Sequence, residues 1–439
     1  MIRKRLLSPF QKFVKIESFS GILLFASTIL ALIWANSTWG DTYEAILQYK
    51  IGFVTEDFQL NKPLILWIND GLMAIFFFLI GLEIKRELLI GELNTLRKAA
   101  SPLLAAVGGM SFPVVLFLLL NQNPETLRGW GIPMATDIAF SLAILTLLGK
   151  RVPLSLKVFL TAFAIVDDIG AVLVIALFYS AGIQWELIGI SFILLAILFA
   201  LSYRNIYALS LTIVLGIIIW VLFLKAGIHP TIAGVLLALT VPIRQKVNFR
   251  EYAEQLKVIV ADIQGSSAYQ GRLLSYEQIA HIDNLEGWTE KVQSPLQHQE
   301  HELHGFVAYF VMPVFALANA GVAITDITAL DYTLIGTISA CLVAGNFLGV
   351  SIMTYLGVKL KITTLPEGVN FKQIFGVAFL AGVGFTMSIF IATLAFSGAP
   401  AIIDSAKVGI LIGSIISGVL GYLILRMSAK KEEKSLKMR

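Results

Sequence analysis

Residues 155–180 read SLKVFLTAFAIVDDIGAVLVIALFYS, an apolar run with two adjacent aspartates, Asp167 and Asp168, near its middle. A run of this length crosses a hydrocarbon core of about 30 Å as a helix. An ionised side chain at that depth costs about 2.5–3.5 kcal/mol on insertion scales, so the presence of each aspartate indicates a functional role. The stretch therefore predicts a transmembrane helix that carries an ionisable site.

The rest of the 439-residue chain has the same apolar character, with 57% hydrophobic and 14% charged residues, whereas soluble domains have about 25% charged residues. We expect membrane spans near 18–36, 63–82, 99–120, 131–148, 155–180, 186–203, 206–224, 229–243, 304–324, 332–356, 371–396 and 406–426. Helices satisfy their own backbone groups in lipid. The sequence thus indicates an all-α polytopic membrane protein of about 12 helices.

Basic residues separate the two faces of this bundle. With the N-terminus inside, the gaps assigned to the outer face hold five of the 33 Lys and Arg residues, and the other 28 fall inside. Cytoplasmic loops carry such an excess. Both termini are therefore expected in the cytoplasm.

Two gaps are long enough to have structure. Residues 49–60 place short β-prone runs around polar turn residues, which predicts a hairpin on the outer face. An isolated two-stranded hairpin is marginally stable, so we expect it to pair with a second subunit; a poorly ordered loop is the alternative. Residues 244–303 are polar and predict a cytoplasmic excursion with one amphipathic helix around 249–263.

Three carboxylates, Asp137, Asp167 and Asp168, fall near the middle of neighbouring spans. Consecutive helical residues point about 100° apart, so Asp167 and Asp168 are expected to face different surroundings. A carboxylate in a medium of low dielectric constant has a raised pKa, and it can hold either a proton or a hard cation. Competition between a proton and a cation for one carboxylate is the minimum requirement for antiport.

Two spans carry the signs of a helix break. Residues 131–140 read GIPMATDIAF, with Pro133 and small polar residues before Asp137, and residues 381–388 read AGVGFTMS. A pair of interrupted spans in two halves of a chain indicates an inverted repeat with its site at the crossing. For a single glycine-rich span, close helix packing is the simpler interpretation.

Other titratable residues lie near predicted helix ends. Those at the cytoplasmic ends are either a simple charge cluster or a funnel that titrates near neutral pH, because histidine does so. They are Glu83, Lys85, Arg86, Glu87, Glu300, His301 and His304. His229 starts a span at the outer side and is either a satisfied interfacial histidine or part of a pH response.

Together these strings resemble the NhaA family of bacterial sodium–proton antiporters, over residues 18–426. The motifs that carry the resemblance are LWIND at 66–70, GLEIKRE at 81–87, ATDIAF at 135–140, Asp167-Asp168, FALANAG at 315–321 and GFTMSIF at 384–390. The resemblance implies broken fourth and eleventh helices that cross at the midplane; inverted repeats are a known property of this family.

The resemblance also implies residue roles. It implies that Asp168 is the central carboxylate for Na⁺ and H⁺, with Asp137, Thr136 and Asp167 beside it and Na⁺ at Asp168 and Asp137. Support at the break is expected from Gly382, Gly384, Thr386 and Ser388. The pH response is expected from Glu83, Arg86, Glu87, Glu300, His301, His304 and His229.

The expected function is pH-regulated export of sodium (or lithium) in exchange for protons, by a non-enzyme without a cofactor. The expected setting is a homodimer in the bacterial inner membrane, with no nucleic-acid partner. We expect one membrane domain over 1–439. Its ion-transport core is expected at 99–180 and 332–426, and its interface helices at 18–82 and 186–324.

Two departures from the family pattern affect these expectations. Many members carry a buried lysine within Gly-Lys-x-x-Gly, where this chain has Gly345-Asn346-Phe347-Leu348-Gly349. Asn346 removes a cation that would pair with a buried aspartate. This leaves stoichiometry and the pH profile open, and the long 244–303 loop leaves regulation open.

Three alternatives compete with this interpretation. The alternative within transport is a cation–proton exchanger of another selectivity, such as K⁺, or one whose exchange is electroneutral. An intramembrane aspartic protease needs two aspartates on facing helices that share a proton, whereas the closest pair here is consecutive. A structural or sensor membrane protein does not need broken helices in both halves.

Overall fold

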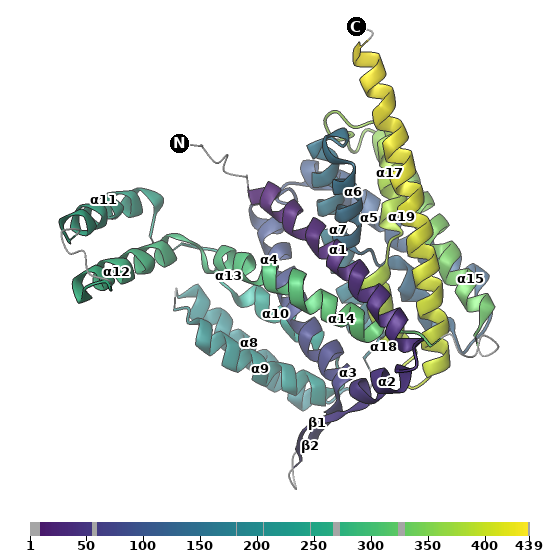
Figure 1. Cartoon of the computed structure of the whole chain (residues 1–439), viewed down its shortest axis with the longest axis horizontal. Coiled ribbons are helices and arrows are strands. Elements are labelled where there is room, and N and C mark those ends of the chain that lie inside the picture. Colours follow the sequence, from purple (N-terminus) through teal and green to yellow (C-terminus); the bar gives the residue numbers. More distant parts are fainter. Residues whose placement is uncertain are drawn as a thin grey trace.

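The computed structural model describes residues 9–54, 59–180, 182–204, 206–245, 247–266, 273–323 and 330–437. Within these ranges ten helical segments are long and apolar enough to cross a membrane, and α1 with α2 forms an eleventh candidate that bends by 111°. The expected all-α polytopic fold is confirmed. Helix α1 begins, and α19 ends, on the face opposite the only strand pair that the described residues form (Figure 1). We call these the terminal face and the hairpin face.

The α-helices are α1 (Pro9–Ala35), α2 (Gly40–Gln48), α3 (Leu64–Leu66), α4 (Met73–Leu89), α5 (Leu96–Leu120), α6 (Ile138–Leu147), α7 (Leu154–Phe178), α8 (Trp185–Tyr203), α9 (Leu209–Ala226), α10 (Thr231–Thr240), α11 (Phe249–Gly265), α12 (Tyr276–Val292), α13 (Pro295–Phe306), α14 (Met312–Asn319), α15 (Tyr332–Ala340), α16 (Asn346–Lys359), α17 (Phe371–Ala381), α18 (Phe385–Ala395) and α19 (Pro400–Lys437). The 3₁₀ segments are η2 (Leu127–Met134) and η3 (Gly149–Arg151), and the π-helical segments are η1 (Trp67–Leu72), η5 (Val307–Val311) and η7 (Cys341–Gly345).

An antiparallel hairpin occupies most of the stretch where one was expected. Strand β1 (Lys50–Val54) pairs with β2 (Gln59–Pro63), from Lys50 opposite Pro63 to Val54 opposite Gln59. Every residue of β1 is exposed, including Phe53 at 78%. The hairpin therefore stands clear of the bundle, as Figure 1 shows.

The span expected at 229–243 is an apolar helix that is shorter than each of the ten candidate spans. Helix α10 has ten residues, so its length is about 15 Å, half of a bilayer core. It packs against α4, where Gly234 and Gly81 let the two backbones approach closely. Close packing against a full-length neighbour keeps this short helix inside the bundle.

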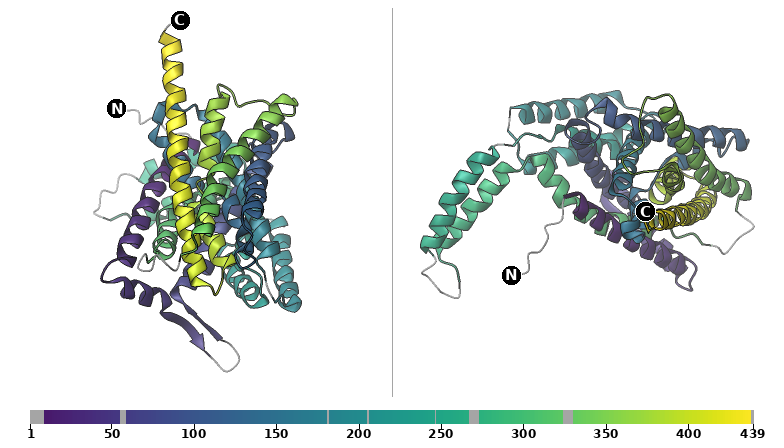
Figure 2. Two further views of the ribbon diagram at one scale, coloured as in Figure 1. Left: turned by 90° about the vertical axis from the view of Figure 1, so that its right-hand side faces the viewer. Right: turned by 90° about the horizontal axis from the view of Figure 1, so that it is seen from above.

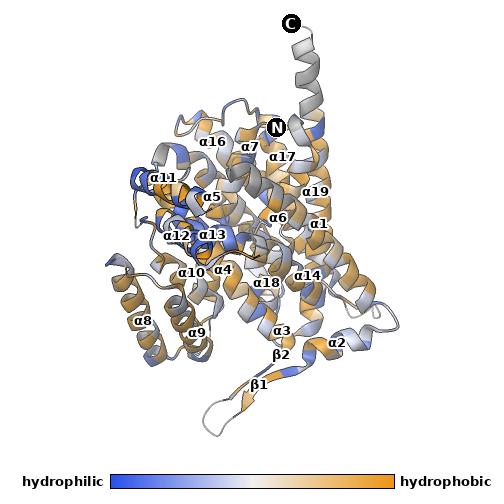
Figure 3. Ribbon diagram, turned by 60° about the vertical axis from the view of Figure 1, so that its left-hand side comes forward, coloured by the Kyte–Doolittle hydropathy of each residue, from blue (hydrophilic) through white to orange (hydrophobic). Residues whose placement is uncertain are grey.

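Within the described residues, the polar stretch at 244–303 holds α11 and α12, of which the sequence predicted one. It also holds most of α13, because the span expected at 304–324 already begins at Pro295. Asn248 caps α11 through Glu251 N, and Ser275 forms a capping box with Gln278 at the start of α12. The pair projects sideways from the bundle and is more hydrophilic than the spans (Figures 2 and 3). The periodicity of α12 is weak, which is why its sequence resembled a loop.

Two spans are broken where the sequence predicted. Segment η2 and α6 are separated by Ala135–Asp137, and α17 and α18 by Gly382–Gly384. Another close helix contact involves α5 and α16, which pack with Gly108 against Gly349. Small residues at a helix interface permit such close packing in a membrane.

Replacing Gly349 with Ala tests this packing. The new Cβ would lie about 2.0 Å from the Gly108 carbonyl oxygen, so the helices must separate. We expect a loss of about 1–3 kcal/mol in stability, typical of overpacking, read as a lower thermal midpoint of the purified protein in detergent. Gly336→Ala is the matched control, because a Cβ there meets no atom within 4 Å. Equal midpoints for the two variants would contradict the close contact.

Candidate functional site

The first break follows from the sequence around Pro133. Proline lacks a backbone N–H, and the chain from η2 leaves helical geometry at Ala135 (ψ 137°) and Asp137 (ψ 103°). Asp137 then becomes the N-cap of α6, where its side chain accepts a hydrogen bond from Phe140 N at 3.1 Å. The residue that ends the extended stretch is thus the one that starts the next helix.

The second break depends on glycine. A Cβ at Gly384 would lie 2.1 Å from Ser388 Oγ and 2.7 Å from the Ala135 carbonyl oxygen. A Cβ at Gly382 would lie 2.2 Å from the Leu342 carbonyl oxygen. Only glycine allows the two interrupted spans to approach this closely.

Residues of each broken span form hydrogen bonds with backbone groups of the other. Asp137 N donates to Val383 O at 2.7 Å, Thr136 Oγ1 donates to Ala381 O at 2.8 Å, and Ser388 Oγ donates to Ile132 O at 2.7 Å. Unpaired backbone groups are costly in lipid, so these bonds hold the crossing together.

Asp137 lies between two helix starts. Its Oδ1 accepts from Phe140 N of α6, and its Oδ2 accepts from Thr386 N at 3.1 Å and Thr386 Oγ1 at 2.5 Å of α18. Helix N-termini carry partial positive charge and favour an anion. The carboxylate is therefore held by both broken spans.

Asp167 and Asn346 contact the first broken span from different helices, Asp167 at the extended stretch and Asn346 at the end of η2. Asp167 Oδ2 accepts from Thr136 N at 2.9 Å, and Asn346 Nδ2 donates to Pro133 O at 3.0 Å and Leu342 O at 3.2 Å. Among the described residues, neither Asp167 Oδ1 nor Asn346 Oδ1 has a hydrogen-bond partner. Asn346 thus serves as a neutral donor to the first broken span, at Pro133, and to its own span, at Leu342.

A cavity lies beside the crossing and brings further carboxylates together. Its lining includes Asp168, Asp137, Thr136 and Thr386, and Glu83 lines it from α4. Its water-accessible space is about 30 Å³, more than the roughly 10–15 Å³ that a water needs. We expected Glu83 in the cytoplasmic charge cluster. Its spacing from the other α4 lining residues, Phe76, Leu79 and Ile80, is the helical pattern that identifies its face.

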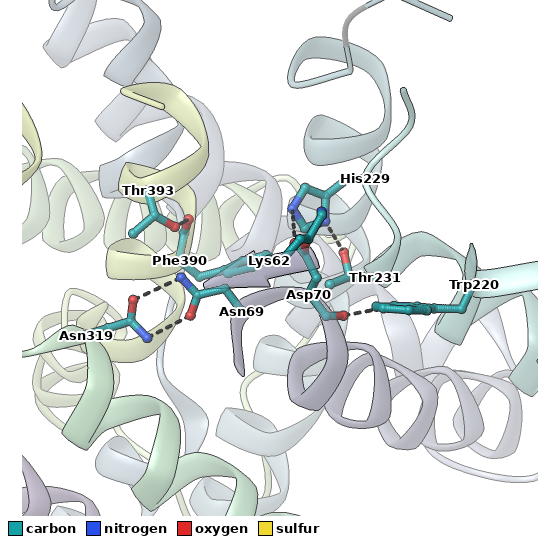
Figure 4. A network of polar contacts seen from close by, with 9 residues as sticks. All are labelled: Lys62, Asn69, Asp70, Trp220, His229, Thr231, Asn319, Phe390 and Thr393. Carbon is teal, nitrogen blue, oxygen red and sulfur yellow. Dashed lines mark hydrogen bonds and ion pairs between the residues drawn. The ribbon is translucent and has the colours of Figure 1, made fainter. Parts of the chain in front are cut away.

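The other residues that we expected in the pH response lie in two different parts of the structure. Arg86 contacts Glu300 Oε1 at 2.5 Å and Glu87 Oε1 at 2.7 Å, and His304 is buried on α13, whereas His301 is exposed. His229 instead lies near the hairpin face, with its Nε2 3.7 Å from Asp70 Oδ1 (Figure 4). It therefore belongs to a separate network.

This arrangement suits a small hard cation or a proton. Carboxylate and hydroxyl oxygens are the ligands that hard cations prefer, and the crossing supplies both. Within the described ranges, no three His, Cys, Asp or Glu side chains converge as a metal centre. Asp167 and Asp168 are consecutive on α7, and Asp167 is bonded to Thr136, which disfavours the shared-proton pair of an aspartic protease.

Comparisons with known proteins agree with this geometry. Residues 11–425 match the family described as Na+/H+ antiporter 1. A Na(+)/H(+) antiporter NhaA of Oleidesulfovibrio alaskensis is 47% identical over 435 residues, which cover 98% of this chain and 96% of the relative. The protein of that name from Bacteroides fragilis is 45% identical (92% and 94% covered), and that from Sulfurimonas denitrificans is 43% identical (97% and 97%).

Thr386→Val tests whether the Thr386 hydroxyl stabilises the crossing. The isosteric change removes the donor to Asp137, and hydrogen bonds to charged groups contribute about 1.5–3 kcal/mol. We expect the thermal midpoint to fall accordingly. Thr393→Val is the matched control on α18, because Thr393 Oγ1 only donates to its own helix at Phe390 O. If both variants melt at the same temperature, the bond to Asp137 is not a significant part of the crossing.

Proposed function

Since the chain belongs to the NhaA family of Na⁺/H⁺ antiporters, we propose that it exports Na⁺, and Li⁺, across the bacterial inner membrane in exchange for H⁺. We further propose that this exchange serves sodium and pH homeostasis. The observation that supports the mechanism is the convergence of Asp137, Asp167 and Asp168 at the crossing of two broken spans.

The proposed ion site is Asp168 with Asp137, and Thr136 and Thr386 beside them. Asp168 and Asp137 line one cavity, so a cation there has a carboxylate from α7 and another from the first break. A carboxylate that binds a proton loses the negative charge that holds Na⁺. Occupancy by one ion therefore excludes the other, and the exchange needs no covalent step and no organic cofactor.

Ion binding is proposed to change the crossing itself. Thr386 donates twice to the Asp137 carboxylate, and Asp137 N donates to Val383 O. A cation or proton at Asp137 competes for the same oxygens. The relative position of α6 and α18 therefore depends on which ion is bound.

We propose that the hairpin face is outside, in keeping with the excess of Lys and Arg in the gaps of the terminal face. We also propose that the chain is a homodimer whose contact includes β1 and β2. A two-stranded hairpin with a fully exposed strand is marginal alone, and pairing with the hairpin of a second copy would cover Phe53 and the strand edge.

The proposed pH response involves the Arg86 cluster at the terminal face. Arg86 joins α4 to α13 through Glu300, and Glu83 lies one turn earlier on α4, in the cavity wall. A change in charge at this cluster thus acts on a helix that lines the ion site. Residues 99–180 and 332–426 are proposed as the ion-transport core, and 18–82 and 186–324 as the interface helices.

Asp168→Asn is the direct test of the ion site. Asn can neither bind a transported proton nor attract a cation with negative charge, so Na⁺-driven dequenching of a pH dye in proteoliposomes should fall to background. Asp331→Asn is the control, because Asp331 caps α15 away from the crossing. Full exchange in Asp168→Asn would remove Asp168 from the centre of the mechanism.

Asn346→Lys tests whether this position sets the coupling. The new ammonium would enter the stretch from Pro133 to Thr136 that Asp167 also contacts, and would supply a cation near that carboxylate. We expect a changed response to a clamped voltage or a shifted pH profile, relative to the neutral control Asn346→Gln. Identical voltage and pH responses in both variants would show that the position does not set stoichiometry.

A further inference from the structure

The ion cavity ends toward the hairpin face at a layer of aromatic side chains. On α18 the last lining residue in that direction is Met387, and on the α13–α14 span it is Met312. One turn further on, each helix presents a fully buried phenylalanine, Phe390 and Phe315. Neither lines the cavity. On both helices, therefore, a buried phenylalanine lies one turn beyond the cavity wall, toward the hairpin face.

Phe390 is the centre of this layer. Its ring centroid lies 5.8 Å from that of Phe77 on α4, 6.2 Å from that of Phe315 on α14, and 5.3 Å from that of His229 before α10. The His229 ring is perpendicular to it, at 89°. We call Phe390 the plug, and Phe77, Phe315 and His229 the socket. The socket residues come from three elements that are separate from the broken span carrying the plug.

Polar contacts hold the socket in place. His229 Nδ1 lies 2.8 Å from Thr231 Oγ1, and its Nε2 faces Asp70, which also binds Lys62 Nζ of β2 at 3.1 Å (Figure 4). Asn69 and Asn319 exchange two hydrogen bonds, at 2.8 and 3.1 Å, and so join η1, which leads into α4, to α14. The walls of the socket are thereby tied together, and to the hairpin.

The described contacts of the plug ring with the socket are ring contacts. Moving the Phe390 ring away from these rings breaks no hydrogen bond, because His229 keeps its contacts with Thr231 and Asp70. Separating the segments that carry the socket would instead break the Asn69–Asn319 bonds and leave buried amide groups unpaired. When α18 moves, the contact that opens is therefore the one around Phe390. Phe390 is also four residues after Thr386, on the same face of α18, and Thr386 binds Asp137.

We propose that the plug, Phe390, acts as a gate: in its socket of Phe77, Phe315 and His229 it closes the ion path toward the hairpin face. The inference rests on the proposed function, because only a transporter needs alternating access to the site. A shift of α18 that follows an ion change at Asp137 lifts the plug out of the socket and opens the cavity to that face.

Access to the cavity tests the gate without measuring transport. In a Cys341→Ala background, Met387→Cys places a reporter thiol in the cavity wall. A membrane-impermeant methanethiosulfonate is applied from the outside of spheroplasts, and separately to inverted vesicles. We expect Phe390→Ala to raise the labelling rate from the hairpin face about tenfold or more, because the open state becomes more populated. Phe396→Ala, just after the end of α18 and outside the socket, should not change it. An unchanged rate in folded Phe390→Ala would overturn the gate.

A metal bridge tests the contact if Phe390→Ala does not fold. With Phe390→Cys in the same background, the introduced thiol and His229 can bind Cd²⁺ together, which is read from thiolate–metal ultraviolet absorption. We expect micromolar Cd²⁺ to inhibit Na⁺/H⁺ exchange and a chelator to restore it. His229→Gln in that variant should remove the inhibition, and Phe396→Cys should show none. Absence of the bridge would refute the contact, and a bound bridge without inhibition would refute the movement. Absence of Na⁺/H⁺ exchange in the Cys341→Ala background with native Phe390, while labelling at Met387→Cys still depends on Phe390, would count against the proposed function and not against the gate.

Discussion

Two interrupted helices inside a membrane must pair each other's free backbone groups, and the rest of this structure depends on that constraint. Lipid offers no hydrogen bonds, so each unpaired N–H or C=O costs several kcal/mol. The crossing meets the constraint with bonds such as Asp137 N to Val383 O and Ser388 Oγ to Ile132 O. The glycine contact of Gly384 against Ala135 makes these bonds reachable. Asp137, a carboxylate of the proposed ion site, is thus also a structural member of the crossing.

The sequence predicted the elements whose signals are local. Pro133 marks the first break, Gly382 and Gly384 mark the second, and aspartates within apolar runs mark the site. What the sequence did not predict depends on how helices rotate and meet. Glu83 was assigned to a charged helix end, but the face that it shares with Phe76 turns it into the cavity wall. Helix α12 was missed because its polar sequence has no strong period.

The contacts of Asn346 show why a resemblance does not replace a structure. The resemblance in the sequence marked the position as unusual, but it did not show what the amide does there. In the structure its Nδ2 bridges Pro133 O and Leu342 O, next to the two breaks. A neutral side chain therefore supplies the backbone pairing that the crossing requires, while it provides no positive charge near Asp167. Structural support and charge compensation are separate tasks at this position.

The crossing also affects how the chain is made. Asp137 and Thr386 are 249 residues apart, so the first break enters the membrane long before its partner is synthesised. At roughly 5–20 residues per second, that interval is about 12–50 s. During this time Asp137 N, the Thr136 hydroxyl and the carbonyl oxygen of Ile132 lack their final partners. Water, lipid headgroups or the insertion machinery must serve these groups until α17 and α18 arrive, so biogenesis of this protein includes a long-lived intermediate with an open, polar break.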